Sequence, residues 1–217
     1  MQNDSRDSED SDHQGQSGEN PPSATRGEYD DDLLEEHLPE FHVIDGLIEY
    51  YFEYCNWIYR HVNCPAFTDA WSRYKAGYSG DRITLATACV IMAVAVYYLP
   101  ERHALLETLS GSREEVGQRY YDVMRSVLQR HQAQSRAYSL ELVELLLISS
   151  HYLSLWKVEP EEIWTIRGEL VSIGTAMGLH RDPGKWKMHR DVAERRRWAW
   201  WHIVLLERWA LVSREKY

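Results

Sequence analysis

The sequence predicts an all-α, multi-helix fold. Apolar residues recur at spacings of three and four over several long stretches, which is the period of an amphipathic helix. No alternating strand pattern of comparable length is present, and Gly-Ser and Ser-Gly pairs fall between the helical stretches, where loops are expected. With 217 residues, 44% of them hydrophobic, the chain can bury one good-sized core. We expect six helices, near residues 41–62, 82–99, 113–133, 138–156, 160–177 and 191–209.

Three of the first four predicted helices show a core-facing stripe directly. The residues of each stripe repeat every three or four positions, so they lie on one side of a helix. We expect these sides to be buried, with Ser149 interrupting the stripe of the fourth helix. The stripes are Ile44, Ile48, Tyr51, Cys55, Ile58 and Val62 in the first helix, Val116, Tyr120, Val123 and Val127 in the third, and Leu142, Leu146, Leu153 and Trp156 in the fourth.

The stretch from Ile83 to Leu99 carries no charge and reaches the lower length limit for a membrane span. It is rich in alanine and threonine, and Arg82 and Glu101 lie close to its two ends. Small side chains let neighbouring helices approach closely, so the sequence favours a central buried helix over a membrane helix. Gly174 and Gly178, four positions apart, likewise indicate close packing and a helix stop rather than a membrane dimer motif.

A turn joins the last two predicted helices. Pro160 begins the first of them, and Gly178 ends it because glycine accepts the left-handed conformation. Asp182-Pro183-Gly184 predicts a turn in which the glycine takes a positive φ. Asp191, with Glu194 three positions later, is similar to a capping box that starts the second helix. The expected stripes are Ile163, Ile166, Leu170, Ile173 and Met177 in the first helix, and Trp198, Trp201, Leu205 and Trp209 in the second.

Short motifs mark the segment from Ile163 to Arg208. They are Gly178-Leu179-His180-Arg181-Asp182-Pro183, then Glu194-Arg195-Arg196-Arg197 running into Trp198, Trp200 and Trp201, and finally Glu207-Arg208. Together they resemble the regulatory "middle homology" domain of fungal transcription factors that carry a binuclear zinc cluster. The segment YYFEYCNWIYRHVNCPAFTDAW, from Tyr50 to Trp71, looks like the opening helix of that domain. The resemblance covers roughly residues 33 to 209, and Glu207 stands where many family members have aspartate.

This resemblance implies a nuclear regulator of transcription by RNA polymerase II with no catalysis of its own. In the family, the domain controls an attached DNA-binding module and responds to a metabolite or a partner protein. DNA is then bound only through the zinc module, and the interactions expected of this chain are protein partners, a small-molecule inducer or a homo-oligomer. The resemblance implies no membrane contact, and it leaves the chain without catalytic, cofactor-binding, metal or DNA-binding residues. Because the family's last aromatic helix continues into further helices, we expect the domain to be incomplete at its C-terminus.

Charge divides the chain into two parts. Residues 1–32 contain ten Asp or Glu and two Arg, a net charge of −8 out of −10 for the whole chain. These residues include few groups that can be buried, so we expect a disordered acidic tail or linker over 1–32 and the partial regulatory domain over 33–217. The tail lacks the bulky apolar residues of activation segments, which favours a solvated linker. The remaining net charge of −2 argues against a globally basic nucleic-acid binder.

Cys55, Cys64 and Cys89 are widely spread, and the chain has no Cys-x-x-Cys. The family's zinc module needs six closely spaced thiolates, so that module is absent from this sequence. We expect the three thiols to be reduced, because nothing indicates a secretory disulfide framework. His61 and Cys64 lie three apart, but two ligands do not make a metal site, and we expect a buried thiol beside a helix-end histidine.

The basic cluster of the chain is the Arg195–Arg197 triplet, with Lys185, Lys187 and Arg190 nearby. One interpretation is contact with DNA or a nuclear-import receptor. The other is that the arginines cover neighbouring tryptophans and pair with acids such as Glu194. Three consecutive arginines point across more than half of the circumference of a helix, so only part of the triplet could face a phosphate groove. The sequence therefore favours internal pairing.

Two other classes of function remain as alternatives. Asp31-Asp32-Leu33-Leu34-Glu35 superficially fits the acidic Mg²⁺-diphosphate motif of helical terpene cyclases, but no second metal-binding cluster occurs at the required spacing. No glycine-rich phosphate loop, nucleophile elbow or His-Glu-x-x-His is present, and we expect His180 to act as a loop hydrogen-bonder rather than a general base. An all-α protein-interaction scaffold is the stronger rival, and residue chemistry alone does not separate it from a transcription regulator.

Overall fold

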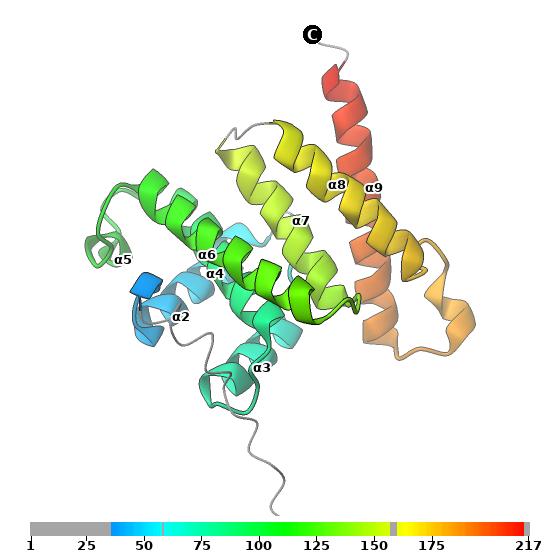
Figure 1. Ribbon diagram of the computed structural model, residues 1–217, viewed down its shortest axis with the longest axis horizontal. Coiled ribbons are helices and arrows are strands. Elements are labelled where there is room, and N and C mark those ends of the chain that lie inside the picture. The colour runs from blue at the N-terminus through cyan, green and yellow to red at the C-terminus, as the bar shows by residue number, and fades with distance from the viewer. Residues whose placement is uncertain (1–35, 58, 157–159, 215–217) are drawn as a thin grey trace, which may run out of the picture.

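The computed structural model describes residues 36–57, 59–156 and 160–214, and the regular elements within these ranges are helices. The prediction of an all-α, multi-helix fold is confirmed. Figure 1 shows the longer helices packed across one another as a bundle. In chain order, the elements are α2 Phe41–Tyr50, η1 Tyr51–Cys55, α3 Cys64–Lys75, α4 Arg82–Tyr98, α5 Ala104–Glu107, α6 Arg113–Gln134, α7 Leu140–Leu155, α8 Pro160–Ala176, η2 Pro183–Trp186 and α9 Arg190–Arg214.

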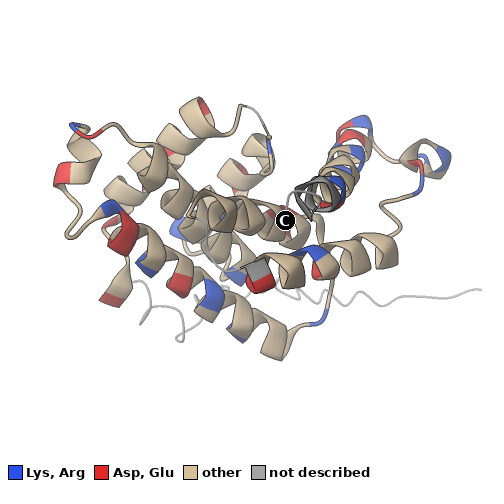
Figure 2. Ribbon diagram, turned by 90° about the horizontal axis from the view of Figure 1, so that it is seen from above, with Lys and Arg blue, Asp and Glu red and all other residues tan. Residues whose placement is uncertain are grey.

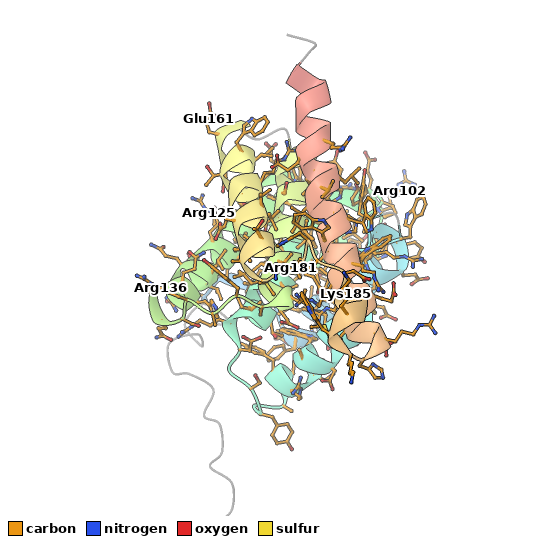
Figure 3. The ribbon with its side chains drawn as sticks, turned by 90° about the vertical axis from the view of Figure 1, so that its right-hand side faces the viewer. Arg102, Arg125, Arg136, Glu161, Arg181 and Lys185 are labelled. Carbon is orange, nitrogen blue, oxygen red and sulfur yellow. The ribbon has the colours of Figure 1, made fainter. Side chains whose placement is uncertain are left out.

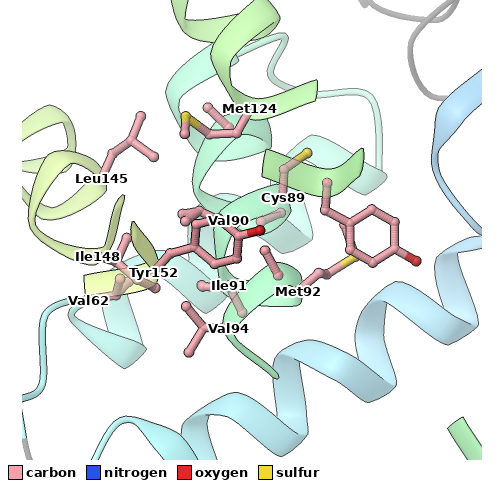
Figure 4. Packing of buried hydrophobic residues seen from close by; sticks show 14 of the residues in the cluster. Val62, Cys89, Val90, Ile91, Met92, Val94, Met124, Leu145, Ile148 and Tyr152 are labelled. Atoms are coloured by element: carbon pink, nitrogen blue, oxygen red, sulfur yellow. The ribbon is translucent and has the colours of Figure 1, made fainter. Parts of the chain in front are cut away.

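Helix α4 forms the centre of the fold. Asp81 caps its N-terminus by accepting hydrogen bonds from two amides of the first turn, each at 3.2 Å. Every residue from Ile83 to Val96 is buried, because α2, α3, α6 and α7 all pack against α4. Figure 4 shows Met124 of α6 and Leu145 of α7 in this packing. The prediction of a central buried helix is confirmed, and no helix in the described ranges has the length and apolarity to cross a bilayer.

Helices α6 and α7 present the predicted stripes to α4. Helix α6 begins with a capping box: the Ser112 amide donates to the Glu115 carboxylate at 2.8 Å, and the Glu115 amide donates to the Ser112 hydroxyl at 3.2 Å. In α7, Ser149 is buried and its hydroxyl donates to the Leu145 carbonyl at 2.7 Å, so it interrupts the stripe without leaving a polar group unpaired. The buried stripe residues are Val116, Tyr120, Val123 and Val127 in α6, and Leu142, Leu146 and Leu153 in α7.

Helices α8 and α9 approach each other closely at a glycine. A Cβ atom on Gly174 would lie 2.8 Å from Cδ1 of Ile203, so only glycine fits this contact without a shift. Gly178 follows α8 in the left-handed conformation, with φ +68°, and the Leu179 amide donates to the Gly174 carbonyl at 2.8 Å. The predicted helix stop and the predicted close packing are both confirmed.

The first predicted helix, 41–62, is too long. Helix α2 passes into a π-helical turn, η1, which ends at Cys55, and the described residues between Cys55 and Cys64 are not helical. A separate helix, α3, follows, which the sequence analysis misses. The Asn63 side chain caps α3 by accepting a hydrogen bond from the amide three positions later at 3.0 Å, and Pro65 lies in the first turn. The aromatic residues continue a helical period across the break, which is why periodicity alone extends the first helix.

The other corrections concern short elements and helix ends. Helix α9 begins at Arg190 and continues to Arg214, so the predicted bounds of 191–209 are too narrow and the capping box starting at Asp191 is wrong. Residues Pro183–Trp186 form a 3₁₀ turn, and the positive φ predicted for Gly184 falls instead on Lys187, at +51°. The short elements α5 and η2 have no periodic signal to predict them. The predicted tail over 1–32 and the acidic motif from Asp31 to Glu35 lie outside the described residues.

Candidate functional site

Arg195 ties the first turns of α9 to α7. Its Nε and Nη2 atoms donate to the two carboxylate oxygens of Glu144, at 2.6 and 3.0 Å, and its Nη1 donates to Glu141 at 2.8 Å. A guanidinium and a carboxylate joined by two parallel hydrogen bonds form a strong and directional pair. Because Glu144 and Arg195 are 51 positions apart, this contact fixes α9 against the middle of the chain.

Glu144 is a buried acid, only 6% exposed. Burial raises the pKa of its carboxyl group, although hydrogen bonds from Arg195 and from the Asn63 amide, at 3.2 Å, act in the opposite direction. Burial also opposes the charge of Arg195, but Glu144 and Glu141 hold the pKa of the guanidinium above its ordinary value. A buried charge without a partner is costly, so the arrangement depends on Arg195. Through Asn63, the same carboxylate also positions the start of α3.

Arg196 and Arg197 are used inside the fold as well. Arg196 donates to a backbone carbonyl at the C-terminal end of α8, at 2.7 Å, and its guanidinium lies 5.4 Å from the ring centre of Trp186. Arg197 donates to Asp182 at 2.8 Å and to Glu194 at 2.6 Å. The interpretation of the triplet as arginines that pair with acids and lie over tryptophan is confirmed.

The other basic residues of this region are on the surface. Arg181, Lys185, Lys187 and Arg190 are exposed, and Figure 3 shows Arg181 and Lys185 at the connection between α8 and α9. Figure 2 shows acidic and basic positions interspersed along α9. The region is therefore of mixed charge rather than uniformly basic.

A cleft of about 740 Å³ opens between α9 and the non-helical segment that precedes α3. Glu144 and Arg195 line it, together with Arg60, Trp57 and Trp198. The volume lies within the range of small-molecule binding sites in proteins. The lining thus combines one buried ion pair, a further arginine and two tryptophan rings with two further acidic residues of α9.

Trp198 joins the two walls of the cleft. Its Nε1 atom donates to the backbone carbonyls of Tyr59 and Arg60, at 3.3 and 3.1 Å, across 139 and 138 positions of sequence. Trp198 nevertheless stays 47% exposed, and Trp57 is 67% exposed. Arg60 has the left-handed conformation, with φ +47°, which costs a residue other than glycine about 1–3 kcal/mol. Strain of this kind persists only where the surrounding contacts hold it.

Three histidines from different parts of the chain meet beside the cleft. His61 and His202 both line it, with ring centres 4.8 Å apart, and His151 lies 5.5 Å from His61. Burial lowers the pKa of all three imidazoles, to about 4 for His151 and for His202. They are therefore neutral at neutral pH. The Nδ1 atom of His61 is buried and has no hydrogen-bond partner. In the ranges that the structure describes, no group of three or more potential ligands is arranged to hold a metal ion.

The sequence prediction for His61 and Cys64 is only partly right. Cys64 is half-buried at the start of α3 rather than buried, and all three cysteines are free. The partners of His61 are His151 and His202, which sequence reasoning misses because no local pattern links the three segments. His180 does accept a hydrogen bond, from Arg181 at 3.4 Å, as predicted for a loop residue.

Comparison with protein families gives a match over most of the chain. The model of the family described as "Fungal specific transcription factor domain" matches residues 48–213, which is more than half of the chain and spans every helix from η1 to α9. A search of curated proteins and a search of solved structures found no significant match.

Proposed function

The chain belongs to the family of fungal specific transcription factor domains, and from this premise we propose that it is the regulatory portion of a factor acting in the nucleus on genes transcribed by RNA polymerase II. In this proposal the chain has no catalytic activity, and DNA is bound by a separate zinc-cluster module. A small-molecule inducer or a protein partner controls the transcriptional output of the chain. The coarser statement, a role in fungal transcription regulation, follows from the family itself.

The observation that carries the proposal is the extent of the family match, residues 48–213. The use of the arginine triplet supports the assignment of DNA contact to another module. Arg195 donates to Glu144, Arg196 donates to a backbone carbonyl just after α8, and Arg197 donates to Asp182. Phosphate binding by these arginines would have to break contacts that hold α9 in place.

The test is a fusion of the full chain to a heterologous DNA-binding module, measured with a reporter gene and by microscopy. The proposal expects reporter output to differ from that of the DNA-binding module alone, and it expects nuclear accumulation. Unchanged output together with cytoplasmic retention would contradict it.

The assignments of DNA binding and catalysis have their own tests. We expect the chain alone to associate with duplex DNA only weakly and in a salt-sensitive manner, so a salt-resistant shift of one particular duplex would contradict a separate DNA-binding module. Mg²⁺-dependent turnover of an isoprenyl diphosphate that is lost on Asp31→Ala and Asp32→Ala would instead establish an enzyme.

One observation favours the scaffold alternative. Trp201 and Leu205 on α9 are 68% and 49% exposed, and large apolar groups on one surface are typical of protein interaction sites. A scaffold would lose self-association or partner binding on Trp201→Ser, while the reporter fusion would be silent with or without this change.

A further inference from the structure

We propose that the cleft between α9 and the segment before α3 binds a small aromatic carboxylate, with Arg60 pairing with the carboxylate and the indoles of Trp57 and Trp198 contacting the ring. This inference deepens the proposed function, on which its regulatory consequence rests, by naming the class of inducer. The site is distinct from the ion pair of Glu144 and Arg195, which forms part of its wall.

The two tryptophans supply an apolar surface suited to a ring. Trp57 and Trp198 both line the cleft and both leave a large part of the indole in water. The Nε1 donor of Trp198 is already bonded to the Tyr59 and Arg60 carbonyls, so the ring is held in place before any ligand arrives. A pre-positioned aromatic side chain loses little conformational freedom on binding, and aromatic stacking adds to the area buried.

Most charged side chains at the cleft have a partner among the described residues, although the pair of Asp191 with His189 is ionic only when the histidine is protonated. Arg195 is neutralised by Glu144 and Glu141, and Glu194 is paired with Arg197. Asp191 lies 3.5 Å from Nδ1 of His189.

Within the described part of the chain, by contrast, the Arg60 guanidinium has no hydrogen bond or ion pair. The strained backbone of Arg60 is fixed by the bond that its carbonyl accepts from Trp198. A planar guanidinium that lines a cleft and has no internal partner is the group best suited to bind a carboxylate.

The histidines supply polar atoms without adding charge. His61 and His202 line the cleft, both are more than nine-tenths buried, and burial lowers the pKa of each imidazole. The Nδ1 atom of His61 lacks a partner, which in a buried position is a cost that a ligand can relieve. Neutral imidazoles hydrogen-bond a hydroxyl group better than they bind a second anion, so we expect a ring hydroxyl to increase the affinity.

The experiment is calorimetric titration of the full chain at pH 7.5 with four related probes: naphthylacetate, its hydroxylated form hydroxynaphthylacetate, the neutral naphthylacetamide and the cationic naphthylethylamine. We expect hydroxynaphthylacetate to bind most tightly, followed by naphthylacetate, then the amide and last the amine. Arg60→Gln should weaken the two carboxylates about 10- to 100-fold, as expected for a charge-assisted bond, and should leave the amide unchanged. Trp57→Ala should weaken all four probes.

Two matched variants control for general effects. Arg102→Gln removes an exposed arginine, and Tyr78→Ala removes an aromatic side chain that is more exposed than Trp57, and neither residue lines the cleft. Both should bind the probes like the unmodified chain. Arg60 and Trp57 are themselves exposed, so their variants are expected to fold, which circular dichroism verifies.

Tighter binding of the amine than of the carboxylates would overturn the proposal in favour of a cation site at Asp191 and Glu194. Absence of binding up to about 1 mM, or carboxylate binding that Arg60→Gln does not change, would also overturn it.

The reporter fusion tests the regulatory function separately from the binding site. Binding of naphthylacetate without any reporter activity of the fusion would sustain the site and contradict the regulatory function. A fusion that changes reporter output in a chain that does not bind naphthylacetate would contradict the site and sustain the regulatory function.

Discussion

Helices α4 and α9 are held in the same fold by different forces. All residues of α4 from Ile83 to Val96 are buried, and most of them pack in one apolar core with side chains of α6 and α7. Helix α9 leaves Trp198, Trp201 and Leu205 exposed, buries a smaller apolar face that includes Ala199 and Ile203, and is also attached through hydrogen bonds of its arginines. Apolar burial distributes the stabilisation of α4 over many side chains. Directional contacts concentrate the attachment of α9 in a few side chains. Single polar changes should therefore matter most at α9, and single volume changes at α4.

The largest effect is expected from Arg195→Met. This change leaves Glu144 buried without its partner, and breaking such a pair lowers the free energy of unfolding by about 3–5 kcal/mol. Urea unfolding measures it. The control is Arg73→Met, in the exposed pair of Arg73 with Asp69 at 2.9 Å, where we expect a loss of about 0–1 kcal/mol. Equal losses in the two variants would mean that α9 is not attached through the buried pair.

A comparison of two leucines comes next. Leu145→Ala removes a fully buried side chain beside α4 and should cost about 2–5 kcal/mol. Leu205→Ala, on the exposed side of α9, should change stability by no more than about 0.5 kcal/mol. Thermal and urea unfolding of both variants give the difference. If Leu205→Ala costs as much as Leu145→Ala, the exposed face of α9 is covered in solution.

Two glycines of α8 test the close contact with α9. Gly174→Ala places a Cβ 2.8 Å from Ile203 and should destabilise the fold by about 1–3 kcal/mol. At Gly168 a Cβ meets nothing within 4 Å, so Gly168→Ala should stabilise the helix by about 0.5–1 kcal/mol. Opposite signs in urea unfolding are the expected result, and a neutral Gly174→Ala would show that α9 shifts at little cost.

The last prediction concerns the pH dependence of stability. His151 and His202 have pKa values of about 4 in the folded chain because burial disfavours their charged forms, whereas an unfolded histidine titrates near 6.5. The unfolded state thus binds more protons, and stability falls as the pH is lowered from about 6.5 towards 4. His202→Gln should reduce the slope of unfolding free energy against pH by at most about 1.4 kcal/mol per pH unit. His42→Gln, at an exposed position, is the matched variant, and a slope that neither change alters would contradict burial of His202.

Sequence reasoning predicts the elements whose signal is local. The stripe of Val116, Tyr120, Val123 and Val127 has the helical period and is buried, and Gly178 ends α8 because only a residue tolerant of positive φ fits there. Helix α3 could have been predicted, since Asn63 followed by Pro65 is a helix-start signal. The aromatic residues before it hide that signal by continuing the period of α2.

The candidate site is less predictable because its parts are distant in sequence. Glu144 lies in a helix whose other inward positions are mostly apolar, and nothing near it in sequence indicates Arg195 as its partner. The contact between His61 and His202 likewise exists only after α9 has packed beside α7. The pairing of Arg197 with Glu194 was predictable because it spans a single helical turn.

The bond from Trp198 to the Tyr59 carbonyl also sets an order of events during synthesis on the ribosome. The two residues are 139 positions apart, which at about 5–20 residues per second corresponds to roughly 7–28 s of elongation. Within that interval Glu144 is made 51 positions before Arg195, so the newly made α7 carries a carboxylate still without its guanidinium. The Tyr59 and Arg60 carbonyls therefore gain the Trp198 hydrogen bonds only after α9 has been made.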